Sequence, residues 1–335
     1  MRFAESSRLS RAVFQVAAHD VRSAHDEGKG MLRFLSRRIL HAVITLFLLF
    51  SVVFVLARAT GDPTGLLVPP EGGAETVQLV RKNLGLDQPY PVQFVLFMKQ
   101  ILSGDLGISF RTRRPVSDLI LERLPYTVIL AIAAMVIGTL LAVPMAMAAS
   151  LNRGRALDTA VQVIGALGIA TPQFWLGLVL IQLFAGGLQL LPVGGAGTWK
   201  HFVLPAVTLG VFQAANMLRV LRSSLLEVLS SDFVTLARMK GLPEYRVIGS
   251  HVMRNAVLPV FTFAGILLAT LMTGTIVVET VFAWPGFGRL AYDATVYRDF
   301  PLIQGVVIVA GLIVVTMNLA VDILYAVLDP RIRFD

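Results

Sequence analysis

The sequence contains no cysteine and few charged side chains. Its 335 residues include 0 cysteines, which excludes disulfides, thiolate metal sites and cysteine nucleophiles. Only 15% of the residues are charged, whereas 56% are hydrophobic, and the mean hydropathy is +0.73. This balance is typical of a membrane protein, for which the lipid bilayer is the main solvent.

The net charge of +8 does not by itself indicate a nucleic-acid partner. The basic residues lie mainly where apolar runs end rather than on one contiguous face. Membrane topology therefore explains the charge, and we expect no nucleic acid among the partners.

Catalytic and metal-binding patterns are also missing. A phosphate-binding loop needs Gly-x-x-x-x-Gly-Lys-Ser/Thr after a strand, and the nearest string, residues 194–200, places Trp199 before the lysine. The histidines His41, His201 and His251 are isolated from one another in the sequence, so no metal site is predicted. We expect no catalytic residue, metal or cofactor in this chain, and we do not expect it to be an enzyme by itself.

Six apolar segments approach the roughly 20 residues that a transmembrane helix needs. They cover residues 39–57, 125–149, 157–186, 203–222, 258–282 and 302–328. We therefore predict an all-α, polytopic membrane protein with six transmembrane helices.

Lysines and arginines near the ends of these spans predict their orientation. They gather in residues 1–38, in the short connection after the second span, in residues 223–257 and in the tail 329–335, which places both termini in the cytoplasm. Residues 187–202 and 283–301 carry few basic side chains and are expected outside.

The segment 58–124 is expected outside although it carries charges of both signs, because so long a loop crosses the membrane largely regardless of charge. Residues 75–83 and 91–103 show helical spacing of apolar side chains and predict short helices at the outer interface. Two roles stay open for them: a packed cap over the helix bundle, or a docking surface or substrate guide.

The first 30 residues are more polar than the rest of the chain. One interpretation is a tail that is disordered or lies at the membrane interface. The other is that residues 1–30 precede the true start at Met31, because MLRFLSRRIL is a natural opening for a first span.

Polar residues at membrane depth are candidate functional residues, because each charge is costly at the bilayer centre. For Glu279, a structural bond to residues 284–288 is an alternative to contact with a substrate. Asp322 can simply reach the inner interface. Interhelical hydrogen bonds are expected for the amides Gln162, Gln173, Gln182, Gln213, Asn216 and Asn318.

Prolines interrupt two of the predicted spans. Pro172, within ATPQFW, breaks the third span, and Pro144 lies in the second. Such interruptions free backbone groups that must be satisfied inside the protein or at a water-filled cavity. We name Pro172, Gln173, Asn216 and Glu279 as possible pathway or gate residues, with packing kinks or structural hydrogen bonds as the alternative.

The most informative segment is a polar, basic stretch between two apolar spans, residues 232–262, which we call the elbow. Asp232 can cap a helix whose apolar residues Phe233, Leu236 and Ala237 fall on one side. This predicts a helix outside the membrane that a partner on the cytoplasmic side can grip.

Three residues predict how the elbow bends. Gly241 ends the first helix, because a helix C-terminus commonly needs a left-handed residue. Pro243 suits the first turn of a second helix, and Leu258-Pro259 is expected to return the chain to the membrane. The elbow is therefore predicted to contain two short helices joined at a rigid bend.

At this point the chain resembles the permease subunits of bacterial ATP-binding-cassette (ABC) importers of the dipeptide, oligopeptide and nickel type, and in particular the first of their two permeases. The resemblance covers residues 31–335. It rests, in order, on MLRFLSRRIL, on GDP at residues 61–63, on residues 84–110 and 115–130, on the elbow, on VETVFAWPGFGRL at residues 278–290 and on the final DPRIRFD. It implies the type I ABC importer permease fold in the bacterial inner (plasma) membrane.

The resemblance also implies a role for the elbow. It is similar to the EAA loop, whose short coupling helix sits in a groove on the ATPase subunit. The Glu-Ala-Ala triplet falls on Thr235, Leu236 and Ala237, and only Ala237 and the following Gly241 match. The residues expected in the ATPase-docking loop are Asp232, Phe233, Ala237, Arg238, Met239, Lys240 and Gly241.

The implied partners are a homologous second permease, two ABC ATPase subunits that bind ATP and Mg, and a periplasmic or lipid-anchored substrate-binding protein. Alternating access between the two permeases would carry dipeptides or oligopeptides, with nickel chelates, glutathione or oligosaccharides as alternatives. An ion-coupled secondary transporter is the alternative of a different class. It predicts several deep acidic residues and inverted repeats, of which the sequence shows few and none, respectively.

Overall fold

The computed structural model describes residues 35–59, 73–83 and 85–328, and every regular element within these ranges is a helix. In chain order they are a first helix Leu35–Ala59, α3 (Ala74–Asn83), α4 (Tyr90–Leu102), α5 (Val116–Leu151), α6 (Ala156–Ala170), α7 (Gln173–Leu180), η1 (Ile181–Gly187), α8 (Trp199–Leu229), α9 (Asp232–Met239), α10 (Glu244–Arg246), η2 (Val247–Met253), α11 (Arg254–Gly274), α12 (Ile276–Val281), α13 (Phe287–Val296) and α14 (Phe300–Leu328). The segments η1 and η2 are π-helical. The polar N-terminal segment, the alternative start at Met31 and the tail 329–335 lie outside the described residues.

Five described helices are long and apolar enough to cross a membrane. They are Leu35–Ala59, Val116–Leu151, Trp199–Leu229, Glu244–Thr273 and Phe300–Leu324. A sixth crossing is available if the bent pair formed by Ala156–Ala170 and Gln173–Gly187 counts as one span. The prediction of an all-α polytopic membrane protein is thus confirmed.

The break that Pro172 predicts in the third span, residues 157–186, is confirmed. The span turns by 99° between α6 and α7. Thr171 takes an extended conformation, with ψ of 120°, and Pro172 follows it with φ of −62°. The residue before a proline is disfavoured in the helical region, which explains why the break falls here.

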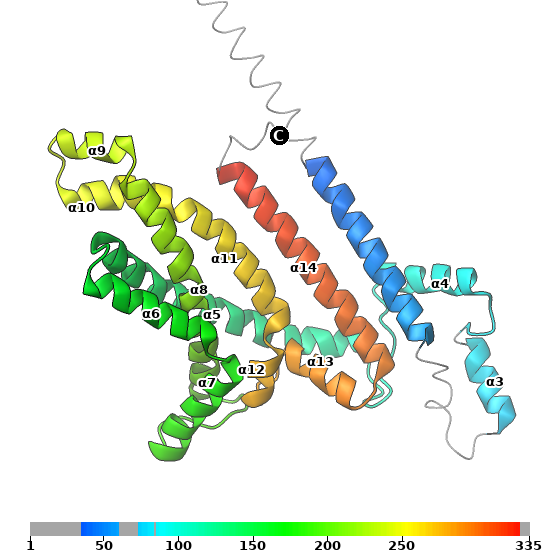
Figure 1. Cartoon of the computed structure of the whole chain (residues 1–335). Helices are drawn as coiled ribbons and strands as arrows, with labels where there is room; N and C mark the ends of the chain where they lie inside the picture. The colour runs from blue at the N-terminus through cyan, green and yellow to red at the C-terminus, as the bar shows by residue number, and fades with distance from the viewer. Residues whose placement is uncertain (1–34, 60–72, 84, 329–335) are drawn as a thin grey trace, which may run out of the picture.

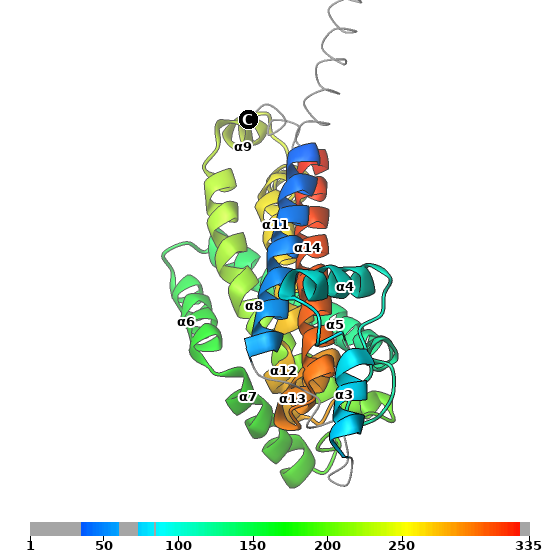
Figure 2. The ribbon, with the colours of Figure 1, turned by 90° about the vertical axis from the view of Figure 1, so that its right-hand side faces the viewer.

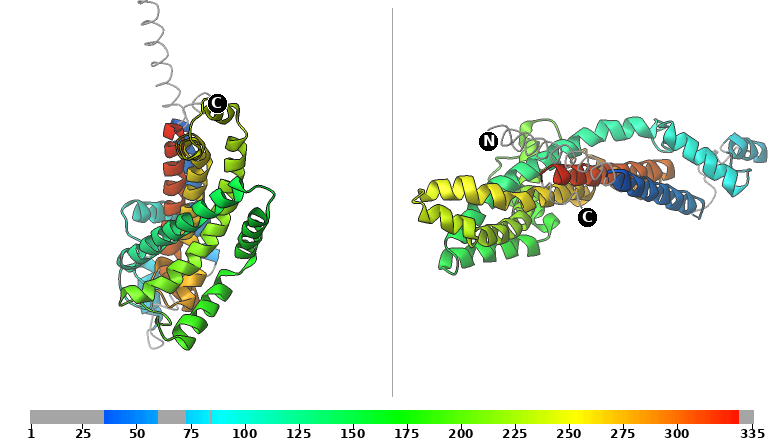
Figure 3. Two further views of the ribbon diagram at one scale, coloured as in Figure 1. Left: turned by 90° about the vertical axis from the view of Figure 1, so that its left-hand side faces the viewer. Right: turned by 90° about the horizontal axis from the view of Figure 1, so that it is seen from above.

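The helices are arranged with distinct ends. The beginning of the first helix, α9 and the end of α14 lie at one end of the molecule, and α7, α12 and α13 lie at the other (Figures 1 and 2). Seen from above, α9 and α10 lie near one extremity of the molecule and the pair α3 and α4 near the opposite one (Figure 3). The predicted short helices at residues 75–83 and 91–103 are confirmed as α3 and α4.

Helix α8 forms the centre of the bundle. Inside the protein, 61% of its most apolar window is buried, against 17% for the first helix and 11% for α14. Small residues let its neighbours approach closely: a Cβ added at Gly138 of α5 would lie 2.9 Å from the Gln213 Cβ of α8, and one at Gly165 of α6 would lie 2.9 Å from a Leu218 methyl. Helix α8 is therefore in direct contact with both α5 and α6.

The prediction that the second helix of the elbow is short and separate from the fifth span is wrong. Pro259 lies inside α11, and the chain from Glu244 to Thr273 forms one long helix through α10, η2 and α11. A proline in a helix removes one backbone hydrogen bond, which kinks a helix but does not necessarily end it. The second helix of the elbow is therefore the beginning of the fifth span rather than a separate element.

Candidate functional site

The first helix of the elbow, α9, is fixed to the bundle by a narrow apolar face. Val234 and Ala237 are buried, and they join a core cluster that includes Leu225 of α8 and Val247 and Val252 of η2. Sequence reasoning placed Phe233, Leu236 and Ala237 on one side of this helix. Of these three only Ala237 is buried, because the helix turns the Val234 and Ala237 face toward the core.

The opposite face of α9 presents large apolar side chains to the outside. The exposed fractions are 44% for Phe233, 49% for Leu236 and 74% for Met239, and nearby Tyr245 is 70% exposed. Helix α9 projects at one end of the molecule, beyond the long spans (Figure 1). Exposed apolar groups gathered on a helix that is too short to span a membrane are typical of an interaction surface.

The bend after α9 has the predicted left-handed glycine. Gly241 has φ of +73°, and its N–H donates to the Arg238 carbonyl at 2.9 Å. The predicted cap by Asp232 is wrong, because Ser231 holds the N-cap position and Asp232 is the first helical residue. Asp232 still favours this helix end, since an acidic side chain complements the N-terminal dipole.

An ion pair closes the bend between α9 and α10. The Arg238 guanidinium donates to Glu244, with Nη2 2.6 Å from Oε1 and Nε 3.3 Å from Oε2. This hydrogen bond raises the pKa of Arg238 above its ordinary value. Arg238 and Lys240 are both exposed at the surface of the elbow, where they add positive charge beside Met239.

The four residues named as a possible pathway or gate do not form one site. Pro172 is exposed and precedes α7, and Gln173 is half-buried at the first position of that helix. Asn216 donates through Nδ2 to the Phe212 carbonyl, 2.9 Å away, so its amide is engaged within its own helix α8. None of these three contacts Glu279 through a hydrogen bond in the described structure.

Glu279 is a structural centre at the other end of the molecule. Its carboxylate is fully buried and accepts hydrogen bonds from the Thr127 hydroxyl at 2.6 Å, the Thr275 hydroxyl at 2.8 Å and the Arg289 N–H at 2.8 Å. A Cβ added at Gly286 would lie 2.3 Å from the carboxylate, so only glycine fits there. The sequence offered a bond to residues 284–288 or contact with a substrate; the structure shows a structural bond just beyond that segment, to the Arg289 N–H.

The surroundings of Glu279 tie three helices together. We call Thr127, Thr275, Glu279 and Arg289 the Glu279 cluster; they come from α5, the α11–α12 junction, α12 and α13. The Thr127 hydroxyl also accepts from the Phe287 N–H at 2.8 Å. Beside the cluster, the Trp284 indole donates to the Tyr126 carbonyl at 3.2 Å.

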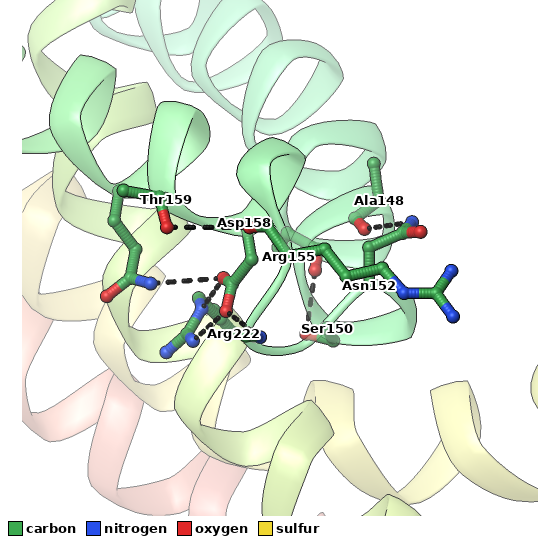
Figure 4. Close-up of polar contacts among 10 residues, drawn as sticks. Ala148, Ser150, Asn152, Arg155, Asp158, Thr159 and Arg222 are labelled. Atoms are coloured by element: carbon green, nitrogen blue, oxygen red, sulfur yellow. Dashed lines mark hydrogen bonds and ion pairs between the residues drawn. The ribbon is translucent and has the colours of Figure 1, made fainter.

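A second buried carboxylate, Asp158 of α6, was not singled out by the sequence reasoning. Arg222 of α8 donates two hydrogen bonds to it in a bidentate contact, from Nε to Oδ1 and from Nη2 to Oδ2, both at 2.8 Å (Figure 4). Asp158 also accepts from the Gly154 N–H at 3.0 Å and from the Gln162 side chain at 3.1 Å. A signal existed, because Asp158 follows the predicted start of one span and Arg222 ends the next.

Two further acidic residues have structural partners. Asp322 of α14 lies 3.2 Å from Arg38 of the first helix. Asp299, which precedes α14, accepts from the Ser109 hydroxyl at 2.5 Å and from the Phe110 N–H at 3.1 Å. Both carboxylates therefore join segments that are distant in sequence.

A cavity of about 1020 Å³ lies between the first helix, α4 and the start of α14. Its lining includes Phe54, Gln93, Phe97 and Gln304. None of the predicted pathway residues lines it.

Comparison with known proteins identifies the family. The family described as "Binding-protein-dependent transport system inner membrane component" matches residues 138–334, and the corresponding N-terminal family of these membrane components matches residues 31–131. The glutathione transport system permease protein GsiC of Salmonella choleraesuis (strain SC-B67) is 41% identical over 305 residues, which cover 91% of this chain and 100% of that protein. GsiC of Escherichia coli (strain K12) shows the same identity and coverage.

A solved structure supports the fold. The MetNI methionine ABC transporter, in an inward-facing conformation, contains a chain that matches with a TM-score of 0.52 and 18% identity. The match covers 63% of this chain and 96% of that one. The protein described here therefore has the type I ABC importer permease fold, and it belongs to the family of binding-protein-dependent transport system inner membrane components, as a permease subunit of an ABC importer of the dipeptide, oligopeptide and nickel type.

Proposed function

We propose that this permease pairs with a homologous second permease in the inner membrane and imports short peptides by alternating access, driven by two ABC ATPase subunits. A periplasmic or lipid-anchored binding protein delivers the substrate at the outer face. ATP and Mg bind to the ATPase subunits, and the permease itself hydrolyses no ATP.

The observation that carries the proposal is the construction of α9. One face is anchored in the bundle through Val234 and Ala237, and the other exposes Phe233, Leu236 and Met239. A helix built in this way transmits a push or pull from a bound partner to α8 and α11, because it does not move without its buried base. We assign the exposed face to the ATPase subunit.

Direction of transport follows from the energetics of ATP binding. A ligand shifts a conformational equilibrium only by its differential affinity for the two states. ATP that binds more tightly to the closed ATPase pair draws the two elbows together and changes which side of the permease pair is open. The cycle then needs no ion gradient, which separates it from a secondary transporter.

The substrate class rests on the relatives. Glutathione is itself a tripeptide, and the GsiC permeases of Salmonella choleraesuis and Escherichia coli, which match this chain along their whole length, are named for glutathione transport. Short peptides are therefore the proposed class, and glutathione is the second candidate within it. Nickel chelates and oligosaccharides are alternatives that the same machinery would accommodate.

Uptake into proteoliposomes tests the proposal. The permease pair, the ATPase pair and the binding protein are reconstituted together, and labelled dipeptides, tripeptides and glutathione are supplied on the outer side. We expect uptake of at least one of these peptides that requires ATP and the binding protein. Uptake that survives omission of the ATPase subunits, or that runs on an ion gradient alone, would refute the ATP-driven mechanism.

A further inference from the structure

The contact between Asp158 and Arg222 has the geometry of a fixed joint between two helices. Arg222 of α8 grips both carboxylate oxygens at 2.8 Å, and Asp158 receives two more hydrogen bonds from Gly154 and Gln162 (Figure 4). A two-pronged guanidinium–carboxylate pair fixes orientation as well as distance. The carboxylate thus binds α8, α6 and the turn between α5 and α6 at one point.

Burial distinguishes this joint from other ion pairs of the described chain. The exposed fractions of its side chains are 20% for Arg222 and 3% for Asp158. They are 48% and 53% in the pair of Arg114 with Glu122, and 42% and 54% in the pair of Arg238 with Glu244. Exposed pairs contribute little, whereas removal of one partner from a buried pair leaves an uncompensated charge.

The position of the joint connects the two ends of the permease. From Arg222, α8 continues to Leu229 and leads through two residues into α9. From Asp158, α6 runs to the 99° break and on into α7. A Cβ added at Gly177 of α7 would lie 3.0 Å from the Phe282 ring, which follows the helix that carries Glu279.

Close approaches at two glycines also join α6 and α8. A Cβ added at Gly165 would lie 2.9 Å from a Leu218 methyl, and one added at Gly168 would lie 2.8 Å from the Ala215 Cβ. Apolar contacts of this kind are not directional, so they oppose sliding or rotation of one helix on the other less than a bidentate ion pair does.

We propose that the Asp158–Arg222 joint makes α6 move together with α8, so that displacement of the elbow reaches the broken α6–α7 unit, and that it sets how much substrate is transported for each ATP hydrolysed. Both are positioning residues, and neither needs to touch substrate. The inference rests on the proposed docking of ATPase subunits at α9.

The test compares transport with ATP hydrolysis in the complete reconstituted complex. Asp158→Asn and Arg222→Gln are expected to keep ATP hydrolysis and to lower uptake per ATP by roughly fivefold or more, the lower end of typical coupling between protein sites. The charge-swapped double variant, D158R with R222D, is expected to recover much of the lost ratio. Arg114→Gln, which breaks an exposed pair, is the matched control and leaves the ratio unchanged.

Cysteine cross-linking gives a second readout that does not depend on the ion pair. The chain contains 0 cysteines, so Asp158→Cys with Arg222→Cys introduces a single reactive pair into it. Before cross-linking, this variant is expected to show the lowered ratio. After a short bis-maleimide, which adds one cysteine thiol across each of its two C=C bonds, joins the two positions, uptake per ATP is expected to rise toward the wild-type value, because α6 and α8 again move together.

The outcomes separate the possible failures. Wild-type complex without ATP-dependent uptake contradicts the proposed function itself. If the wild-type complex is active and the assembled single variants show an unchanged uptake per ATP, only the proposed role of the Asp158–Arg222 joint is contradicted. Cross-linking that blocks transport shows that α6 and α8 must separate, and it overturns the inference. Single variants that fail to assemble, beside a charge-swapped variant that assembles and transports normally, would limit the pair to a role in assembly and would also overturn it.

Discussion

The elbow and the Glu279 cluster lie at opposite ends of the molecule and differ in how far their side chains are satisfied within the chain. At the Glu279 cluster, a fully buried carboxylate has three hydrogen-bond donors from its own chain. At the elbow, Phe233, Leu236 and Met239 of α9 remain exposed outside the spans. The carboxylate of one region is satisfied within the chain, and the other region leaves apolar side chains exposed in the described structure.

This difference assigns different roles to the two regions of the permease subunit. A region that is complete by itself acts as a rigid anchor for α5, α12 and α13. Under the proposed docking, α9, with its buried base and exposed apolar face, would receive force from the ATPase subunit. Stability of the isolated subunit should therefore depend on the Glu279 cluster, and assembly with the ATPase should depend on the elbow.

Removal of the buried carboxylate should have the largest effect on stability. Glu279→Ala leaves the donors of Thr127, Thr275 and Arg289 without an acceptor, and each unsatisfied buried group costs about 1–3 kcal/mol. We expect the free energy of unfolding to fall by at least about 3 kcal/mol, measured by thermal unfolding of the purified subunit in detergent. Thr280→Ala, on the same helix, removes only a bond to that helix's own Ile276 carbonyl and is the control. An unchanged Tm for Glu279→Ala would break the comparison.

A methyl group beside the same carboxylate should have the next largest effect. In Gly286→Ala the new Cβ would stand 2.3 Å from the Glu279 carboxylate, and overpacking of this kind costs about 1–3 kcal/mol. The predicted result is a lower Tm together with reduced recovery of folded protein. If Gly286→Ala behaved like the wild type, the packing around Glu279 would be looser than described.

Substitution of Gly241 in the elbow should lower the stability of the subunit less than substitution of Gly286. Gly241 has φ of +73° but no atom within 4 Å of an added Cβ, so Gly241→Ala pays only for the left-handed backbone, on the order of 1 kcal/mol. Thermal unfolding of both glycine variants under the same conditions makes the comparison. A larger decrease in Tm for Gly241→Ala than for Gly286→Ala would show that the elbow, and not the Glu279 cluster, is the more rigid region.

The exposed face of α9 should matter least for stability and most for assembly. Met239→Asp is expected to change the free energy of unfolding by less than about 0.5 kcal/mol, as is usual for a surface substitution. Capture of the ATPase subunits should nevertheless weaken by roughly tenfold or more, because truncation of a central contact residue typically costs 2 kcal/mol or more. Val193→Asp, at an exposed apolar residue outside the elbow, is the control for added charge. Undiminished capture with Met239→Asp would remove α9 from the docking surface.

The sequence predicted what depends on local chemistry. Hydropathy located the spans, Pro172 marked the break in the third one, and Gly241 marked the left-handed end of α9. These features succeed because a proline, a glycine or an apolar run acts on the backbone next to it. The continuity of the helix through Pro259 was missed for the complementary reason, since packing of the whole helix outweighs one lost hydrogen bond.

The long-range contacts were beyond sequence reasoning. Asp158 and Arg222 are 64 residues apart, and Thr127 and Glu279 are 152 residues apart. No local pattern relates such residues, because their meeting depends on the crossing of α6 with α8 and of α5 with α12. The face of α9 that is buried also depends on this packing, which is why the buried Val234 was missed and Ala237 was grouped with the exposed Phe233 and Leu236.

Thiol labelling of α9 tests the central claim most directly. Met239→Cys and, as a control outside the elbow, Val193→Cys each introduce a single cysteine into a chain that contains 0. Labelling by a membrane-impermeant maleimide is compared in open membrane fragments with and without the ATPase subunits. The account predicts that the ATPase strongly protects Met239→Cys and leaves Val193→Cys unchanged. Equal labelling of Met239→Cys in both preparations would contradict it.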